Sequence, residues 1–129
     1  ARFDFTQPSN ESTIILKVGE KKLHVSKQIL SVHSPVFAAM FYGEFEEKNK
    51  EEIEINEVKY EEFVDLLNMI YPTSIEANAR TVAHILKLAD LYDCKVVLER
   101  AESYLIDTTK FTTAAKLKMA DEYRLDHLK

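Results

Sequence analysis

The sequence predicts an α+β fold in which a small three-stranded sheet packs with helical hairpins, followed by the start of a helical extension. Two short β-favouring runs flank Gly19 and Glu20, and a third run alternates apolar and polar residues. The second half of the chain carries apolar residues at helical spacing. Only two glycines and three prolines occur in 129 residues, which is few for a fold of many strands and turns.

The three predicted strands come early in the chain. The runs "TIILKV" over 13–18 and "KLHV" over 22–25 favour β structure, and the two residues between the runs suit a hairpin turn. In "EIEI" over 52–55 the apolar residues alternate with glutamates, so both isoleucines should face one side of the sheet. Residues 1–11 are expected to form a loose lead-in segment before this domain.

Two short helices are predicted between the second and third strands. Ser26 can cap a helix that continues to about Val32. Ser34 can cap a second helix with Pro35 at its first position, where the missing N–H costs nothing. Gly43 suits the position just after this helix, which is commonly left-handed.

Four further helices are predicted, with Pro72 ending the first and Thr81 capping the second. The segments "LKLADLY" at 86–92 and "LKMADEY" at 117–123 share five of seven residues, an echo that often marks stacked helical hairpins. We therefore expect residues 107–129 to begin a C-terminal helical extension that is incomplete in this chain. The predicted helices cover approximately 60–71, 82–92, 96–106 and 113–128.

Charge and cysteine content limit the classes of function. The net charge of −5 argues against nucleic acid as the main partner, because affinity for phosphates comes largely from Lys and Arg. No apolar run approaches the roughly 20 residues that span a bilayer, so no membrane partner is expected. Cys94 is the one cysteine and has no intrachain disulfide partner, which favours a reducing, intracellular compartment, either cytoplasm or nucleus.

No catalytic, metal or cofactor site is predicted. Two glycines cannot build a phosphate-binding loop. The pair His33–Ser34 fits a helix cap before a proline better than a base and nucleophile. The histidines lack Cys or His partners at metal-ligand spacing. They are His24, His33, His84 and His127.

An acidic stretch at 44–52 holds five glutamates, two lysines and one large apolar side chain, Phe45. It lacks the alternating Asp/Asn ligands and central glycine of a calcium loop. One interpretation is a solvated loop whose phenylalanine folds back onto the core. The other is an aromatic anchor with a polar rim at a protein interface, where burial of one Phe could contribute about 2–3 kcal/mol. The residues alone leave both open.

The stretch "LHVSKQILSVHSPVFAAMFYGEFEE" resembles the BTB/POZ domain family, whose members carry H-V-x-K-x-x-L followed by S-P-V-F-x-x-M-F. The stretches "IEINEVKYEEFVDLLNMIYP" and "LKLADLYDCKVVLERAESYL" fit later elements of that family. The resemblance covers about residues 12–106. "IYP" and "GEFEEKNKEEIEI" are most similar to the BTB domains of nematode MATH–BTB proteins.

The resemblance implies a non-enzymatic protein-interaction module. As a homodimer, it would bind the N-terminal region of cullin-3 and act as a substrate adaptor in a ubiquitin ligase, with substrates bound through another domain outside this chain. Ile29 is implied in the dimer contact. The cullin-binding residues are implied to be the hydrophobic-x-Glu motif and a turn between later helices, namely Phe45, Glu46, Glu47, Tyr92 and Asp93.

Two other functions are compatible with the same fold. One is a homo-oligomerising BTB scaffold or transcription-related module that binds no cullin, and the other is a linker of the Skp1/elongin C type. Many members of the family carry a further N-terminal helix that strengthens the dimer, and residues 1–12 show no such helix pattern.

Overall fold

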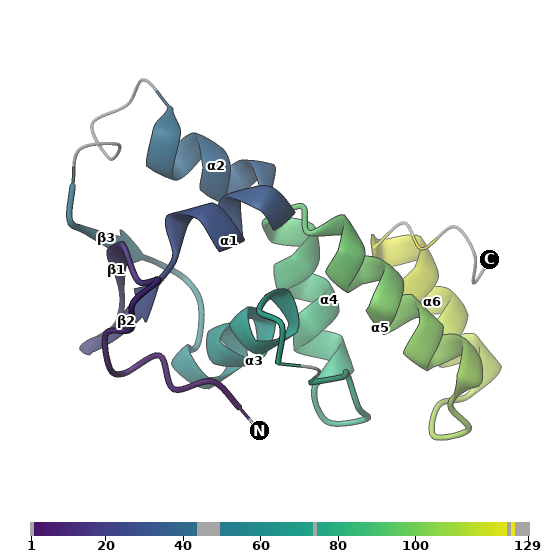
Figure 1. The fold of residues 1–129 in the computed structure, drawn as a ribbon. Coiled ribbons are helices and arrows are strands. Elements are labelled where there is room, and N and C mark those ends of the chain that lie inside the picture. The colour runs from purple at the N-terminus through teal and green to yellow at the C-terminus, as the bar shows by residue number, and fades with distance from the viewer. Residues whose placement is uncertain (1, 44–49, 74, 124, 126–129) are drawn as a thin grey trace.

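The computed structural model describes residues 2–43, 50–73, 75–123 and 125. These residues form three strands and six helices (Figure 1), which confirms the predicted α+β fold with a three-stranded sheet and helical hairpins. The helix predicted over 113–128 ends at Tyr123, and Leu125 lies outside it. In chain order the elements are β1 Ile14–Val18, β2 Lys21–Val25, α1 Lys27–His33, α2 Pro35–Tyr42, β3 Glu52–Ile55, α3 Tyr60–Ile70, α4 Val82–Leu91, α5 Lys95–Asp107 and α6 Thr113–Tyr123.

The sheet has the strand order β2-β1-β3. Strands β1 and β2 form the predicted antiparallel hairpin, with Leu16 opposite Leu23, and Gly19 in the turn has a φ of 63° that suits glycine. Strand β3 runs parallel to β1, with Ile53 beside Leu16. Alternate side chains of all three strands are buried, because one face of the sheet covers the core.

The caps of the first two helices form as predicted. The Ser26 hydroxyl accepts a hydrogen bond from the Ile29 amide at 3.2 Å, and the Ser34 hydroxyl accepts one from the Phe37 amide at 3.0 Å. Gly43 ends α2 as predicted, but it does not take the left-handed conformation that is common after a helix. This residue has φ −68° and ψ 178°, an extended conformation open to any residue.

Thr81 stands at the N-cap position of α4 as predicted, but its side chain does not cap the helix. Thr81 already has a helix-like backbone (φ −104°, ψ −21°), and its side chain makes no capping bond. Asn78 supplies the bonds instead, because its side-chain oxygen accepts from the amides of Arg80 at 2.9 Å and Thr81 at 3.1 Å. Helix α4 is thus preceded by an Asx turn that begins three residues earlier than the expected cap.

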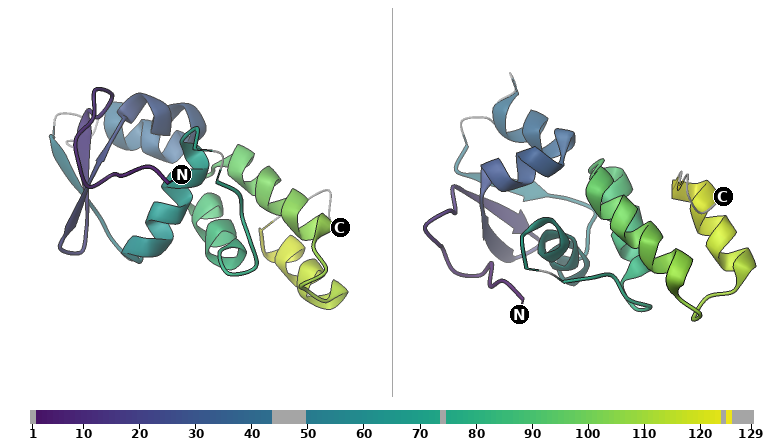
Figure 2. Two further views of the ribbon diagram at one scale, coloured as in Figure 1. Left: turned by 60° about the horizontal axis from the view of Figure 1, so that its bottom comes forward. Right: turned by 45° about the vertical axis from the view of Figure 1, so that its right-hand side comes forward.

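Figures 1 and 2 show the sheet at one end of the molecule, α6 at the other, and α1 to α5 between them. The core fills the space between the inner face of the sheet and the helices. Its largest fully buried side chains come from elements far apart in the sequence, which is why the chain forms one packed unit. They are Phe5, Phe37, Phe41, Phe63, Leu16, Leu23, Leu30, Leu66, Leu67, Ile85, Leu86 and Leu105.

The two copies of the internal echo occupy equivalent helices with different burial. Ala89 in α4 and Ala120 in α6 are both fully buried. Leu86 in α4 is also fully buried, whereas the equivalent Leu117 in α6 is 45% exposed. Helix α6 therefore buries one side against α4 and α5 and leaves its leucine side open among the described residues.

The chain before β1 packs more closely than the predicted loose lead-in. Phe5 is 2% exposed and belongs to the core. Its carbonyl oxygen accepts a hydrogen bond from the His24 amide at 2.7 Å, on the outer edge of β2. We call residues 2–5 the N-terminal strap. Phe3 and Phe5 do alternate with Arg2 and Asp4, as in a strand, but the alternation spans only four residues, the shortest run that indicates a strand, and this is why it was not predicted.

Candidate functional site

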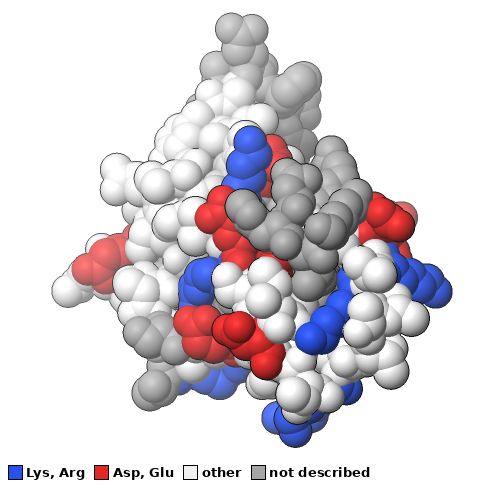
Figure 3. Space-filling model, turned by 90° about the vertical axis from the view of Figure 1, so that its right-hand side faces the viewer, with Lys and Arg blue, Asp and Glu red and all other residues white. Residues whose placement is uncertain are grey.

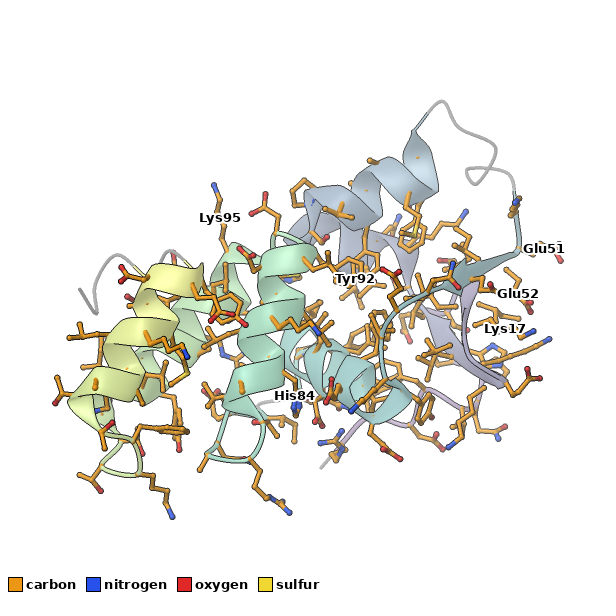
Figure 4. All side chains as sticks on the ribbon, turned by 180° about the vertical axis from the view of Figure 1, so that it is seen from behind. Lys17, Glu51, Glu52, His84, Tyr92 and Lys95 are labelled. Atoms are coloured by element: carbon orange, nitrogen blue, oxygen red, sulfur yellow. The ribbon has the colours of Figure 1, made fainter. Side chains whose placement is uncertain are left out.

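The hydrophobic-x-Glu motif predicted to bind a partner, Phe45, Glu46 and Glu47, lies outside the described residues. The structure does place the elements on either side of it. Helix α2 leads into the motif and β3 follows it, with Glu51 just before the strand and Glu52 as its first residue (Figure 4).

Helix α2 is joined directly to the turn between α4 and α5. The Ser34 hydroxyl, at the start of α2, donates a hydrogen bond to the Tyr92 carbonyl oxygen at 2.6 Å. The Phe37 ring stacks on the Tyr92 ring with centroids 4.5 Å apart and planes inclined by 7°. Because both contacts are buried, the start of α2 and the α4–α5 turn behave as one rigid unit.

Tyr92, predicted at the cullin contact, has its side chain in the core and is only 5% exposed. Figure 4 shows it directed into the body of the protein, whereas Lys95 points away from it. Burial raises the pKa of Tyr92 to about 12, and burial likewise raises the pKa of the neighbouring Cys94 to about 12. Both groups are therefore neutral at physiological pH, and the Cys94 thiol has little thiolate character.

Asp93, the other residue predicted at this turn, is partly exposed and has a φ of 53°. Aspartate tolerates this left-handed conformation better than most residues. The conformation lets the chain reverse between α4 and α5, where the Cys94 amide bonds to the Ala89 carbonyl oxygen at 2.8 Å. At this turn Asp93 and Leu91 therefore contribute to the surface, and the Tyr92 side chain packs in the core beneath them.

Three exposed apolar side chains on these elements were not singled out from the sequence. Leu91 and Tyr42 are both 56% exposed, and Val36 is 38% exposed. Each belongs to a helix with buried apolar neighbours, so a count of apolar residues gives no sign of which ones face outward. We call α2, Leu91 and Asp93 the α2–turn surface.

A separate apolar groove of about 560 Å³ lies between α1, the end of α3 and α5. Ile29, predicted at the dimer contact, forms part of its wall. Val32, 80% exposed, and Val96, 50% exposed, also line the groove, which we call the α1 groove. Its full lining is Ile29, Val32, His33, Met69, Ile70, Tyr71, Pro72, Glu76, Val96, Val97 and Arg100.

One wall of the α1 groove is held by Arg100. Its guanidinium donates hydrogen bonds to the carbonyl oxygens of Met69 and Ile75, each at 2.8 Å, and pairs with the Glu76 carboxylate. These bonds tie the segment after α3 to α5. The groove therefore has a fixed shape with an apolar lining and a charged border.

The remaining surface offers little for chemistry. Figure 3 shows the face that carries the C-terminal helices, where basic and acidic residues are interspersed. Across the described ranges, no group of three or more His, Cys, Asp or Glu residues is arranged to hold a metal ion. In the same ranges no helix combines the length and apolar character that crossing a bilayer requires.

Comparison with known proteins gives one consistent match. The family model for the BTB/POZ domain matches residues 4–109. BTB and MATH domain-containing protein 36 of Caenorhabditis elegans is 45% identical over 125 residues, which are 96% of this chain and 39% of that protein. BTB and MATH domain-containing protein 38 of the same organism is 34% identical over 98% of this chain and 33% of its own length. The chain thus spans less than half of these curated relatives.

Solved structures agree on the fold. The BTB domain of zebrafish PATZ1 superposes with a TM-score of 0.62 and 21% identity, over 75% of this chain and 77% of that one. The BTB domain of human gigaxonin gives a TM-score of 0.61 and 18% identity, over 73% and 77%. At these identities the similarity shows a shared fold.

Proposed function

The chain belongs to the BTB/POZ domain family, and on that basis we propose that it is a non-enzymatic protein-interaction domain that dimerises and binds the N-terminal region of cullin-3. It would act in the cytoplasm or nucleus as the adaptor part of a ubiquitin ligase. Its substrates would be held by another domain of the same protein.

The observation that carries the cullin proposal is the locked contact between α2 and the α4–α5 turn. Ser34 and Tyr92 hold these two elements together, and Phe45 follows α2 by three residues. The α2–turn surface, which includes Asp93 and precedes Phe45 in the chain, therefore has a rigid base on which a partner can dock. A pre-organised base favours binding, since little conformational entropy is lost when a partner docks.

The test is a calorimetric titration of the chain with the cullin-3 N-terminal region. Phe45→Ala is expected to weaken binding by about 30-fold, because truncation of an interface anchor typically removes 2 kcal/mol or more. Glu47→Ala is expected to weaken it less. Glu51→Ala, an exposed glutamate outside the motif, is the matched control. Equal affinity of wild type and Phe45→Ala, with equal thermal stability, would reject the anchor.

A second candidate is a self-associating module that binds no cullin, and the α1 groove favours it. An apolar groove with two strongly exposed valines at its lining is the kind of surface that a second copy could cover. Both candidates predict a dimer in light scattering, so the titration of the same samples with cullin-3 separates the two functions. A dimer that shows no heat of binding with cullin-3 would favour the second candidate.

A further inference from the structure

The N-terminal strap is held by hydrogen bonds to two different elements. The Phe3 amide donates to the side-chain oxygen of Asn68 on α3 at 2.9 Å, and the Phe5 carbonyl oxygen accepts from the His24 amide on β2 at 2.7 Å. Asn68 is fully buried, and its amide nitrogen donates to the Val64 carbonyl oxygen at 3.0 Å. Its oxygen is therefore oriented toward the strap, and departure of the strap would remove that bond from a buried polar group.

An ion pair adds to this attachment. Arg2 Nη2 lies 2.8 Å from one carboxylate oxygen of Asp65, and His84 Nε2 lies 2.8 Å from the other. Glu62 lies 4.0 Å from the second ring nitrogen of His84. Because Arg2 is half exposed, this pair contributes less than the buried bond to Asn68. Figure 4 shows His84 near the start of α4.

Three aromatic rings connect the strap to the end of α3. The Phe3 and Phe5 centroids are 4.8 Å apart, and they lie 5.0 Å and 4.8 Å from the Tyr71 centroid. Phe5 meets Tyr71 edge to face, at 89°. Each ring thus touches the other two, and the strap limits where the Tyr71 ring can lie.

Tyr71 also belongs to the α1 groove. It lines the groove, and its hydroxyl oxygen accepts a hydrogen bond from the buried Ser26 amide at 2.8 Å. Ser26 in turn caps α1 through the Ile29 amide. A chain of direct contacts therefore leads from the strap through Tyr71 and Ser26 to the helix that forms one wall of the groove.

We propose that the N-terminal strap is a positioning element for the α1 groove, setting the place of Tyr71 and of the start of α1 so that a second copy can dock there. The docking part rests on the dimerisation proposed above. Among the described residues, the hydrogen bonds, ion pair and ring contacts of the strap's anchoring residues go to α3, Tyr71 and β2. Release of the strap should therefore change self-association and leave the α2–turn surface intact.

The test compares Arg2→Ala/Phe3→Ala, which weakens the strap and keeps Phe5 in the core, with Gln7→Ala/Asn10→Ala. The control alters two exposed residues just after the strap. Amide hydrogen exchange at Ser26, measured by NMR, reports the bond to Tyr71 directly. We expect exchange at Ser26 to be about tenfold faster in the strap variant than in the control. We expect self-association, measured by sedimentation, to be weaker by about threefold to tenfold, with unchanged affinity for cullin-3.

A second variant tests the link itself. Tyr71→Phe keeps the ring and removes the hydroxyl that accepts from Ser26, so exchange at Ser26 should accelerate while the Phe3 amide stays protected. Persistent protection of Ser26 in this variant would overturn the proposed route through Tyr71.

The outcomes separate this inference from the proposed function. Equal exchange at Ser26 in the strap variant and its control would overturn the inference whether or not the chain dimerises. Faster exchange with unchanged self-association would also overturn it. If the wild-type chain is monomeric at every concentration, the proposed dimerisation fails, and the exchange measurement alone decides whether the strap positions the groove wall.

Discussion

The Ser34 hydroxyl connects two elements that are 58 residues apart: it donates to the Tyr92 carbonyl oxygen at 2.6 Å while it accepts from the Phe37 amide at 3.0 Å. The sequence predicts Ser34 only as a helix cap. In the structure its hydroxyl also forms the hydrogen bond that holds α2 to the α4–α5 turn. Because Ser34 is fully buried, both bonds form away from water, where an unmatched polar group is costly.

Ser34→Ala is expected to lower the free energy of unfolding by about 1–3 kcal/mol, because it leaves the Phe37 amide and the Tyr92 carbonyl without their partner. Urea denaturation measures the change. Ser103→Ala, at an exposed position of α5, is the matched control and should have little effect. Equal stability of the two variants would mean that the buried bonds contribute nothing net.

Because the backbone at Asp93 is left-handed, we expect the stability of the protein to depend strongly on which residue occupies this position. Asp93→Gly should keep the free energy of unfolding within about 1 kcal/mol of wild type, because glycine adopts a φ of 53° freely. Asp93→Val should lower the free energy of unfolding by about 1–2 kcal/mol more than Asp93→Gly does, because a β-branched side chain is strained in this conformation. Thermal unfolding of the pair measures the difference. If the two variants unfold together, the turn has relaxed to another conformation.

The buried Tyr92 and Cys94 predict a loss of stability at alkaline pH. Burial raises the pKa of Cys94 from 9.0 to about 12 and that of Tyr92 from 10.0 to about 12. The unfolded chain ionises first as the pH rises, so the stability that these groups confer is complete below about pH 9 and is lost as the pH approaches 12.

Urea denaturation midpoints measured from pH 8 to pH 11 test this prediction. Each unit by which folding raises a pKa corresponds to about 1.4 kcal/mol of stability lost at high pH. Cys94→Ala, which has no thiol to ionise, should lose less stability than wild type across this interval. The same slope in both proteins would exclude Cys94 as a contributor.

The α1 groove predicts a surface variant that separates self-association from folding. Val32→Asp should weaken self-association at least about tenfold, because it places a charge in an apolar interface. Folding should be unaffected, since Val32 is 80% exposed. Val36→Asp, at an exposed valine on α2 outside the groove lining, is the control. Sedimentation velocity measures both, and an unchanged dimer in Val32→Asp would exclude the α1 groove as its interface.

Local signals explain which elements were predictable. Alternation in "EIEI" and apolar stripes at helical spacing predict strands and helices, because burial of one face requires those periods. The caps at Ser26 and Ser34 were predictable because a hydroxyl just before a helix bonds to an amide within the next turn. The family resemblance, carried by whole stretches of sequence, was confirmed by the family model over residues 4–109.

Contacts between distant segments decided the rest. Tyr92 faces the core because Phe37, on another helix, stacks against its ring. The spacing of apolar residues near Tyr92 does not predict this contact between distant segments. The strap likewise depends on Asn68 and Tyr71, more than sixty residues away in the sequence. The sequence by itself determined the elements, their order and the family. Only the tertiary structure decided which apolar side chains are exposed and that one tyrosine joins the strap to a groove, because exposure depends on what packs over each residue.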